Sequence, residues 1–408
     1  MTSDLKPPAP VPSPSPSDGR PLRIGITCYP TFGGSGIIAT EVGLSLARRG
    51  HRVHFICSDI PSRLDQFVDT LFFHAVEVRD YPLFDHSPYT LALTSKMVEV
   101  ATYEKLDLLH VHYAIPHATS AYLARQILGR AAPRIVTTLH GTDITLVGND
   151  RTFLPITRFS ILQSDGLTVP SKFLERATHE NLDIPEYVPI EVIPNFIDTE
   201  IYKPVAEKRW GPLRHLFDRG GTQCEEPAVR PRVLVHNSNF RPLKRVDDVV
   251  RVFAEVRKHV PALLVLVGDG PERSRVEALV RSLELDGTVC FLGKQRNFVD
   301  VLQNADVFVQ PSETESFGLA AAEALACGVP VVASRVGGVP EVVTDGEVGL
   351  LCELGDVQGM AAKVRRLLED DALYGKLATA ARARVESLWP REPTVTRYEN
   401  YYRTVLAR

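Results

Sequence analysis

The chain alternates short apolar runs with stretches whose apolar residues recur at helical spacing. The first example is an apolar, β-branched run at residues 22–29, a glycine-rich turn and a helical pattern at 37–50. A second apolar run at 51–58 completes a strand–helix–strand unit. Because such units lay their strands side by side in one direction, the pattern predicts an α/β fold with a parallel, doubly wound sheet.

The same alternation continues for about 150 residues. Strands are predicted at 106–113, 134–140 and 166–171, and helices between them at 118–128 and 153–163. The segment 190–204 follows, and its Pro and Asn residues suit a hinge. We therefore expect a first Rossmann-like domain at 22–204.

After a polar stretch at 205–231 the pattern restarts. Six strands are predicted, at 232–240, 262–270, 288–293, 306–312, 330–334 and 349–353, with helices between them. This gives a second Rossmann-like domain at 205–385, with helices on both faces of its sheet. The helical pattern at 386–408 is expected to cross back onto the first domain, whereas the Pro/Ser-rich segment 1–21 is expected to be a disordered tail.

Composition and charge limit the classes of protein to which the chain can belong. The 408 residues suit two domains, and 44% hydrophobic with 24% charged residues is typical of globular proteins. A formal net charge of −4 gives no general attraction to nucleic acid or to anionic lipid. We expect a cytoplasmic protein without a membrane-spanning helix or a stable membrane association, with six reduced cysteines, and we leave homo-oligomerisation open.

The first glycine cluster, Gly33, Gly34, Ser35 and Gly36, lies between the first strand and the first helix. Glycines allow a close backbone approach, and a helix start offers unpaired N–H groups to a phosphate or a carboxylate. The spacing differs from the dinucleotide fingerprint GxGxxG, which argues against a nicotinamide-dependent dehydrogenase. A tight turn without a ligand is the alternative.

The segment 311–338 carries two glutamates eight residues apart, Glu315 and Glu323, with small residues between them. If a helix starts near Phe317, the N–H groups of Phe317, Gly318 and Leu319 point toward an anion such as a diphosphate. Glu323 then lies on the helix, where it could accept hydrogen bonds from a ribose, and Glu315 could bind sugar hydroxyls. Alternatively, both are ordinary helix charges.

A basic segment at 238–250 follows a predicted strand and opens a helix. Arg241 and Lys244 could bind the two phosphates of a sugar nucleotide and stabilise the departing nucleoside diphosphate. Arg245 is interpreted as a solvated surface residue.

Polar residues of the first domain could complete the site. His140 ends a strand, so we expect it to face the cleft where doubly wound sheets bind ligands. Tyr113, Thr142 and Arg158 could form a polar pocket beside it, with the guanidinium of Arg158 binding a carboxylate. A structural hydrogen bond is the alternative role for His140.

Taken together, these motifs resemble those of the family 4 retaining glycosyltransferases of the GT-B fold, over residues 22–408. Glu315 and Glu323 match the family's E-x7-E motif, and Lys244 matches the lysine of its basic pair. The family's arginine is replaced by Asn239, and we expect Arg241 to take its place. The resemblance implies catalytic roles for Lys244, Arg241, Glu315 and His140.

A closer resemblance, carried by RIGITCYPTFGGSGIIATEVG, LHVHYAIPHATSAYLA and TLHGTDITLVGND, is to the members of this family that begin bacillithiol biosynthesis. It implies UDP-N-acetylglucosamine as the donor and L-malate as the acceptor. The donor would then contact Gly34, Ser35, Phe317, Gly318, Leu319 and Glu323, and the acceptor Ser35, Tyr113, Thr142 and Arg158. Relatives in the mycothiol pathway, which use inositol phosphate, are the nearest alternative.

The resemblance implies transfer of the sugar with retention of the configuration at its anomeric carbon. The leaving phosphate would accept the proton of the acceptor hydroxyl. No acidic DxD cluster stands in a metal-binding context, so no metal and no other cofactor is expected. A non-catalytic protein that senses nucleotide sugars is the alternative of a different class.

Overall fold

The structure is a computed structural model. It describes residues 19–31, 33–64, 67–78, 88–145, 150–207, 213, 216, 230–295 and 297–408. Most of the expected tail (1–21) and of the polar stretch (205–231) lies outside the described residues.

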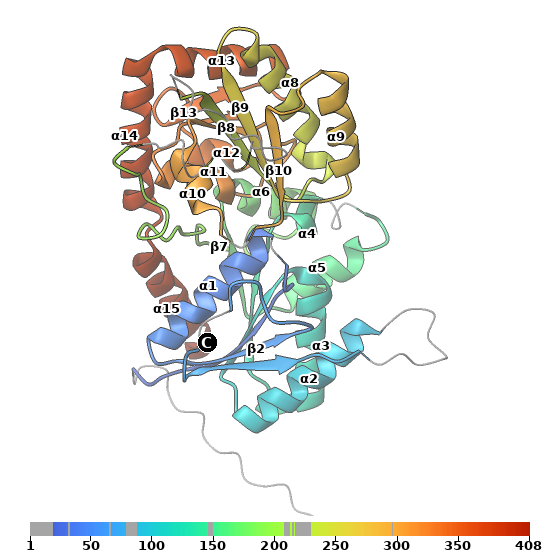
Figure 1. Cartoon of the computed structure of the whole chain (residues 1–408). Helices are drawn as coiled ribbons and strands as arrows, with labels where there is room; N and C mark the ends of the chain where they lie inside the picture. Colours follow the sequence, from blue (N-terminus) through green and yellow to red (C-terminus); the bar gives the residue numbers. More distant parts are fainter. Residues whose placement is uncertain are drawn as a thin grey trace, which may run out of the picture.

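Two lobes are stacked one above the other (Figure 1). The first lobe, residues 19–193 together with the last helix, is built on a parallel seven-stranded sheet of order β3-β2-β1-β4-β5-β6-β7. Its strands are β1 (Arg23–Thr27), β2 (Arg52–Cys57), β3 (Leu71–Ala75), β4 (Leu108–His112), β5 (Arg134–Thr138), β6 (Gly166–Val169) and β7 (Glu191–Val192).

The helices of the first lobe connect successive strands. They are α1 (Gly34–Arg48), α2 (Tyr89–Glu104), the single turn η2 (Ala114–Ala118), α3 (Thr119–Leu128), η3 (Gly129–Ala131), α4 (Thr142–Thr145), α5 (Leu154–Leu162) and α6 (Lys172–Asn181). Apolar side chains on both faces of the sheet are buried beneath them, as a parallel sheet requires. Ile24 and Leu108 belong to the core on one face, and Leu109 and Val111 to the core on the other.

The second lobe, residues 230–388, repeats this architecture around a parallel six-stranded sheet of order β10-β9-β8-β11-β12-β13. The strands are β8 (Arg232–Asn237), β9 (Ala262–Val267), β10 (Val289–Gly293), β11 (Val307–Gln310), β12 (Val331–Ser334) and β13 (Gly349–Cys352). The helices are η4 (Pro242–Lys244), α8 (Val246–Arg257), α9 (Arg273–Ser282), α10 (Val299–Asn304), α11 (Leu319–Ala326), α12 (Val339–Val342), α13 (Val357–Glu369) and α14 (Asp371–Leu388).

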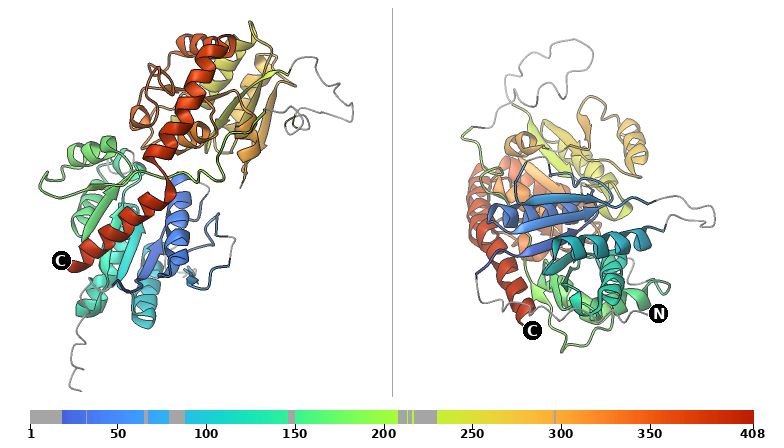
Figure 2. Two further views of the ribbon diagram at one scale, coloured as in Figure 1. Left: turned by 90° about the vertical axis from the view of Figure 1, so that its left-hand side faces the viewer. Right: turned by 90° about the horizontal axis from the view of Figure 1, so that it is seen from below.

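The chain changes lobe twice, and the two crossings lie side by side. The N–H of Ile197 donates to the carbonyl of Trp389 at 3.0 Å, where the outgoing segment meets the returning one. α14 ends at Leu388, so the return falls at Trp389–Pro390 rather than at the expected boundary between 385 and 386. The last helix, α15 (Arg391–Ala407), then runs down the first lobe beside α1 (Figure 2).

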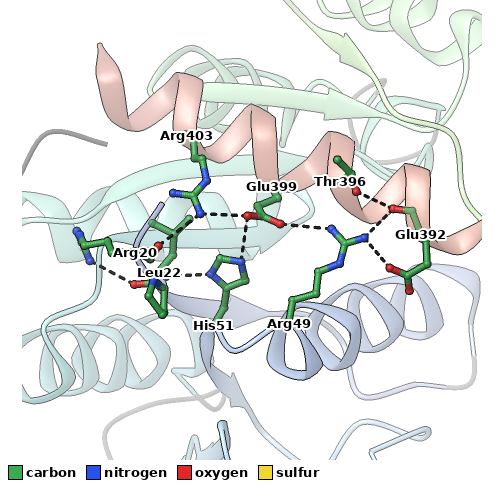
Figure 3. Close-up of polar contacts among 9 residues, drawn as sticks. Arg20, Leu22, Arg49, His51, Glu392, Thr396, Glu399 and Arg403 are labelled. Carbon is green, nitrogen blue, oxygen red and sulfur yellow. Dashed lines mark hydrogen bonds and ion pairs between the residues drawn. The ribbon is translucent and has the colours of Figure 1, made fainter. Parts of the chain in front are cut away.

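Apolar and charged contacts both fix α15 to the first lobe. Tyr398 and Tyr402 are buried in the core that also contains Ile24. Around them, Glu399 accepts hydrogen bonds from Arg49 at 3.3 Å and from Arg403 at 3.0 Å, and its carboxylate lies 3.4 Å from Nε2 of His51 (Figure 3).

The predicted fold class, two Rossmann-like doubly wound domains, is confirmed. β3, α2 and α6 were not among the predicted elements. The five cysteines in the described part of the chain form no disulfide; four are buried and Cys290 is half-buried, whereas Cys224 lies outside that part.

Candidate active site

A cavity of about 430 Å³ opens between the two lobes, within the usual size range of a small-molecule site. It lies where the carboxyl ends of strands from both sheets face each other, the position at which doubly wound sheets bind ligands. Eleven of the residues selected from the sequence line it: Gly34, Ser35, Tyr113, His140, Thr142, Arg241, Lys244, Glu315, Phe317, Gly318 and Leu319.

An ion pair marks the wall formed by the second lobe. Nζ of Lys244, at the end of η4, lies 2.6 Å from Oε1 of Glu315, in the loop between β11 and α11. Burial raises the pKa of Glu315, but the Lys244 ammonium and hydrogen bonds from Ser312 and Gln310 outweigh it, so that the pKa lies below its ordinary value. The carboxylate of Glu315 is therefore ionised at neutral pH.

Arg241 and Asn239 line the same cavity as this pair, and the guanidinium of Arg241 makes no hydrogen bond or ion pair to any described residue. Arg241 is exposed, so its charge is available to a ligand in the cavity. Arg245 turns away and pairs with Asp248 at 2.7 Å, as expected of a surface residue.

The start of α11 forms the floor of the cavity. The helix begins at Leu319, two residues after the expected start near Phe317, and Gly318, with φ +97°, caps it. The side chain of Phe317 instead packs edge-on against Trp389 at 5.5 Å between ring centroids. The helix N-terminus still opens into the cavity at Gly318 and Leu319, where its unpaired N–H groups favour an anion.

The first lobe supplies the opposite wall. The hydroxyl of Tyr113 donates to Oγ of Ser35 at 2.8 Å, at the first turn of α1. α1 has no side-chain cap and no acidic residue in its first turn, so its N–H groups add a second site for an anion. Thr142 and His140 complete this wall.

A buried carboxyl that the sequence reasoning missed holds this wall in place. Asp143 accepts hydrogen bonds from the N–H of His140 at 3.1 Å and from the N–H of Ala114 at 3.2 Å. Burial raises the pKa of Asp143 to about 6, against the opposing effect of these hydrogen bonds. Its position three residues after His140, in LHGTD, was the available signal.

Direct contacts join the two lobes at the rim of the cavity. Oγ of Ser316 donates to the carbonyl of His140 at 2.7 Å, and Oγ of Ser171 donates to the carbonyl of Ser316 at 2.5 Å. Ser316 is one of the small residues between Glu315 and Glu323. The structure thus holds the lobes in contact directly beside the Lys244–Glu315 pair.

The structure does not bring Glu323 into the cavity. Its carboxylate is about 5% exposed and lies 3.5 Å from Nη2 of Arg63, which also donates to the hydroxyl of Tyr202. Burial raises the pKa of Glu323 despite this cation. The partner of this carboxylate thus comes from the first lobe, and the contact between Glu323 and a ribose stays a prediction.

Arg158 also lies outside the cavity. It stands on α5, 41% exposed, and its Nη1 is 2.9 Å from the carboxylate of Asp183. The guanidinium of Arg158, which we expected to bind a carboxylate of the ligand, instead binds a carboxylate of the protein. Arg158 is not among the residues that line the cavity.

Among the described residues, one group approaches a metal-binding arrangement: His54, His74 and Glu104. Nδ1 of His54 lies 3.0 Å from Nε2 of His74, but it is the other nitrogen, Nε2, that lies 3.8 Å from Glu104. One ligand atom from each of the three residues nevertheless lies within 4.8 Å of the other two. As a separate finding, no helix in the described part of the chain is both long and apolar enough to span a membrane.

Comparison with known proteins is consistent with this site. A family model described as Glycosyltransferase Family 4 matches residues 32–201, and one described as Glycosyl transferases group 1 matches residues 225–384. The chain is 46% identical over 392 residues to an N-acetyl-alpha-D-glucosaminyl L-malate synthase of Bacillus anthracis, covering 94% of this chain and 97% of that one.

Two more distant proteins match most of the length of the chain. A D-inositol 3-phosphate glycosyltransferase of Saccharomonospora viridis is 28% identical over 403 residues, covering 92% of this chain and 90% of that one. Among solved structures, Anabaena HepE in complex with UDP-glucose superimposes with a TM-score of 0.77 at 20% identity, covering 94% of this chain and all of that one.

Proposed function

The chain belongs to the family 4 glycosyltransferases and has their GT-B fold, and from this premise we propose that it transfers N-acetylglucosamine from UDP-N-acetylglucosamine to the hydroxyl of L-malate. One observation carries the proposal. The Lys244–Glu315 pair, the start of α11 and His140, which come from different lobes, line a single cavity. The relative that is 46% identical supports this choice of substrates through its name.

The donor fits the wall formed by the second lobe. Its diphosphate would lie against Lys244, Arg241 and the N–H groups at Gly318 and Leu319, which together supply cations and an oriented helix dipole. The sugar would then reach Glu315, whose carboxylate can accept hydrogen bonds from hydroxyl groups. Binding of the nucleoside by Glu323 requires that Arg63 release its carboxylate.

The acceptor fits the wall formed by the first lobe. A carboxylate of malate would be held by the first turn of α1 and by the hydroxyl groups of Ser35, Tyr113 and Thr142. Arg158 contributes to this binding only if it leaves Asp183.

The proposed reaction breaks the bond between the anomeric carbon and the β-phosphate of UDP, and forms a bond to the malate hydroxyl on the same face. The hydroxyl proton passes to the leaving phosphate. Lys244 and Arg241 stabilise the charge that develops there, and the closed cavity positions both substrates. Burial lowers the pKa of His140 to about 3, so its ring is neutral and we assign it no role as a general base.

The test is to incubate the purified full chain with UDP-N-acetylglucosamine and either L-malate or inositol phosphate. We expect release of UDP and a product with the mass of N-acetylglucosaminyl malate in the α configuration. Transfer to inositol phosphate and not to malate would instead assign the chain the activity named for the D-inositol 3-phosphate glycosyltransferases. Binding of UDP with no release in any mixture would identify a sensor and overturn the proposal.

A further inference from the structure

We propose that His112 is a positioning residue that determines which ring nitrogen of His140 carries the proton, so that His140 presents an N–H donor, at Nδ1, to the cavity. The assignment of the proton rests on the geometry of the two rings and on the burial that keeps them neutral. Its consequence for catalysis rests on the proposed function.

The two imidazoles are joined inside the first lobe. Nδ1 of His112, the last residue of β4, lies 2.7 Å from Nε2 of His140, and the two rings are stacked at 18° with 5.0 Å between their centroids. His112 is fully buried, whereas His140 lines the cavity. Among the described residues, Nδ1 of His140 makes no hydrogen bond and is left to the cavity.

Both rings are neutral. Burial, with a smaller effect of the neighbouring His117, lowers the pKa of His140 to about 3. Burial and the nearby imidazoles of His110, His140 and His117 lower the pKa of His112 well below its ordinary value. A neutral imidazole carries one N–H, so a hydrogen bond between the two rings requires that one of them donates and the other accepts.

The unpaired atom of His112 decides between the two arrangements. Its Nε2 is buried with no hydrogen-bond partner in the described part of the chain. If His140 were the donor, the proton of His112 would have to be on this Nε2, as a buried N–H without an acceptor. If His112 donates from Nδ1, its Nε2 is a bare acceptor, and buried groups of that kind are tolerated better than orphaned N–H groups.

The adjacent His117 shows the same arrangement. Its Nδ1 lies 2.5 Å from the carbonyl of His112, and a carbonyl can only accept, so the proton of His117 must be on Nδ1. The Nε2 of His117 is therefore a bare acceptor, and it too is buried without a hydrogen-bond partner among the described residues. This cluster already contains one imidazole of the kind that we assign to His112.

The consequence for the cavity follows from the proton count. With Nε2 accepting from His112, the proton of His140 is on Nδ1 and points to the ligand. A donor suits a cavity that binds phosphate and carboxylate oxygens, whereas a bare lone pair there would repel them. His140 thereby acts as a neutral donor beside the cations Lys244 and Arg241.

The proton positions can be measured directly by NMR on full-length protein labelled with ¹⁵N-histidine and ²H. We expect long-range ¹H–¹⁵N spectra to show protonated Nδ1 for both His112 and His140 at neutral pH. A protonated Nε2 on His140 overturns the proposal, whatever the activity of the protein. If no transfer to malate occurs, the proposed function is lost but this spectrum still decides the positions of the protons.

Two substitutions test the consequence for catalysis. His112→Asn keeps an N–H donor near the position of Nδ1, and we expect kcat to fall by no more than about threefold. His112→Leu removes the donor, and we expect kcat to fall by about tenfold or more with little change in KM for the donor sugar nucleotide. Because His112→Leu also leaves Nε2 of His140 without its donor, the melting temperature is measured for each variant beside kcat.

His54→Leu is the matched control, since His54 is another fully buried histidine whose Nε2 has no hydrogen-bond partner in the described residues, and it lies away from the cavity. We expect its kcat to stay at the wild-type value. Equal kcat for the Leu and Asn variants at position 112 would overturn the positioning role, as would a loss of kcat that follows the loss of stability in all three variants.

Discussion

The carboxylate of Glu341 in the second lobe accepts a 2.7 Å hydrogen bond from the backbone N–H of Phe173 in the first. Its other oxygen accepts from the N–H of Lys172 at 3.0 Å, so that one lobe caps the helix α6 of the other. A carboxylate suits this position, because a helix N-terminus carries unpaired N–H groups and a partial positive charge. The lobes are thus joined by a contact that would break if they separated.

Glu341→Gln should weaken this contact. The amide keeps one acceptor but loses the charge, and hydrogen bonds to a charged group contribute about 1.5–3 kcal/mol each, so we expect kcat/KM to fall by about tenfold. Small-angle scattering in the presence of UDP should show a more open molecule. Glu180→Gln, exposed on the same helix α6, is the control. Equal kinetics for both variants would contradict a role for Glu341 in closure.

Lys244→Ala should remove most of the turnover. Loss of one preorganised group that stabilises the leaving charge costs about 10²-fold in kcat or more. Lys258→Ala, whose side chain is 61% exposed and pairs with Glu255, should be unaffected. Because Lys244→Ala also leaves the half-buried Glu315 without its cation, the double variant Lys244→Met with Glu315→Gln should be made as well. We expect it to be folded by circular dichroism and inactive; activity near the wild-type level in either variant would remove the assigned role.

Much of the site could be predicted because it is local in sequence. His140 and Lys244 follow predicted strands, and the carboxyl ends of parallel strands meet at one edge of a sheet, so their approach follows from the pattern. The start of α11 lies two residues after Phe317 because the backbone at Gly318 has a positive φ, which the amino-acid type permits but does not require.

The parts that could not be predicted depend on contacts between distant segments. Glu323 is held by Arg63, which is 260 residues away in the chain, and no spacing within 311–338 indicates this partner. Arg158 meets Asp183 for the same reason. β3 was not predicted because it lies at the edge of the sheet and its residues are mostly half-buried. In such a strand the alternation of apolar and polar positions is weak.

Tyr402→Phe should destabilise the attachment of the last helix. The hydroxyl of Tyr402 lies 2.7 Å from Nδ1 of His110, and both side chains are fully buried. The substitution leaves a buried nitrogen unpaired, so we expect the free energy of unfolding in urea to fall by about 1–3 kcal/mol. Tyr103→Phe, at a position that is 85% exposed, should change it little. Equal stabilities would show that the hydroxyl makes no net contribution.

Asp143 should make the stability of the first lobe depend on pH in the opposite sense to an ion-paired carboxylate. Its pKa is raised from 3.8 to about 6 by burial, so the protonated form is favoured in the folded state. The stability that this form contributes is fully present below pH 3.8, the ordinary pKa that applies to the unfolded chain. It is lost as the pH rises through about 6, the pKa in the folded protein.

The measurement for Asp143 compares wild-type protein with Asp143→Ala by urea unfolding at about pH 4 and about pH 8. We expect the loss of unfolding free energy on substitution to be larger at the lower pH. The exposed Asp286→Ala corrects for the general effect of pH on the protein. A larger loss at the higher pH would mean that the hydrogen bonds to Asp143 outweigh its burial.

Gly141→Ala should block the contact between the lobes at the cavity. Gly141 has φ +94°, and a Cβ there would lie 2.0 Å from Oγ of Ser316, the atom that donates to the carbonyl of His140. The Ser316 side chain would have to leave this position, and the closed arrangement of the two walls would be lost. We therefore expect kcat/KM to fall by at least about tenfold, the effect of losing roughly 1.4 kcal/mol.

Strain from the positive φ must be separated from this steric effect. Gly287 has φ +81°, and a Cβ at this position would meet no described atom within 4 Å, so Gly287→Ala carries the strain without the clash. The strain alone should cost each variant about 1–2 kcal/mol of unfolding free energy, since a left-handed backbone costs an L-residue about that much, and the clash adds to this loss in Gly141→Ala. Only Gly141→Ala should also lose activity. Equal activity in the two variants would mean that the lobes need not meet at Ser316 for transfer to occur.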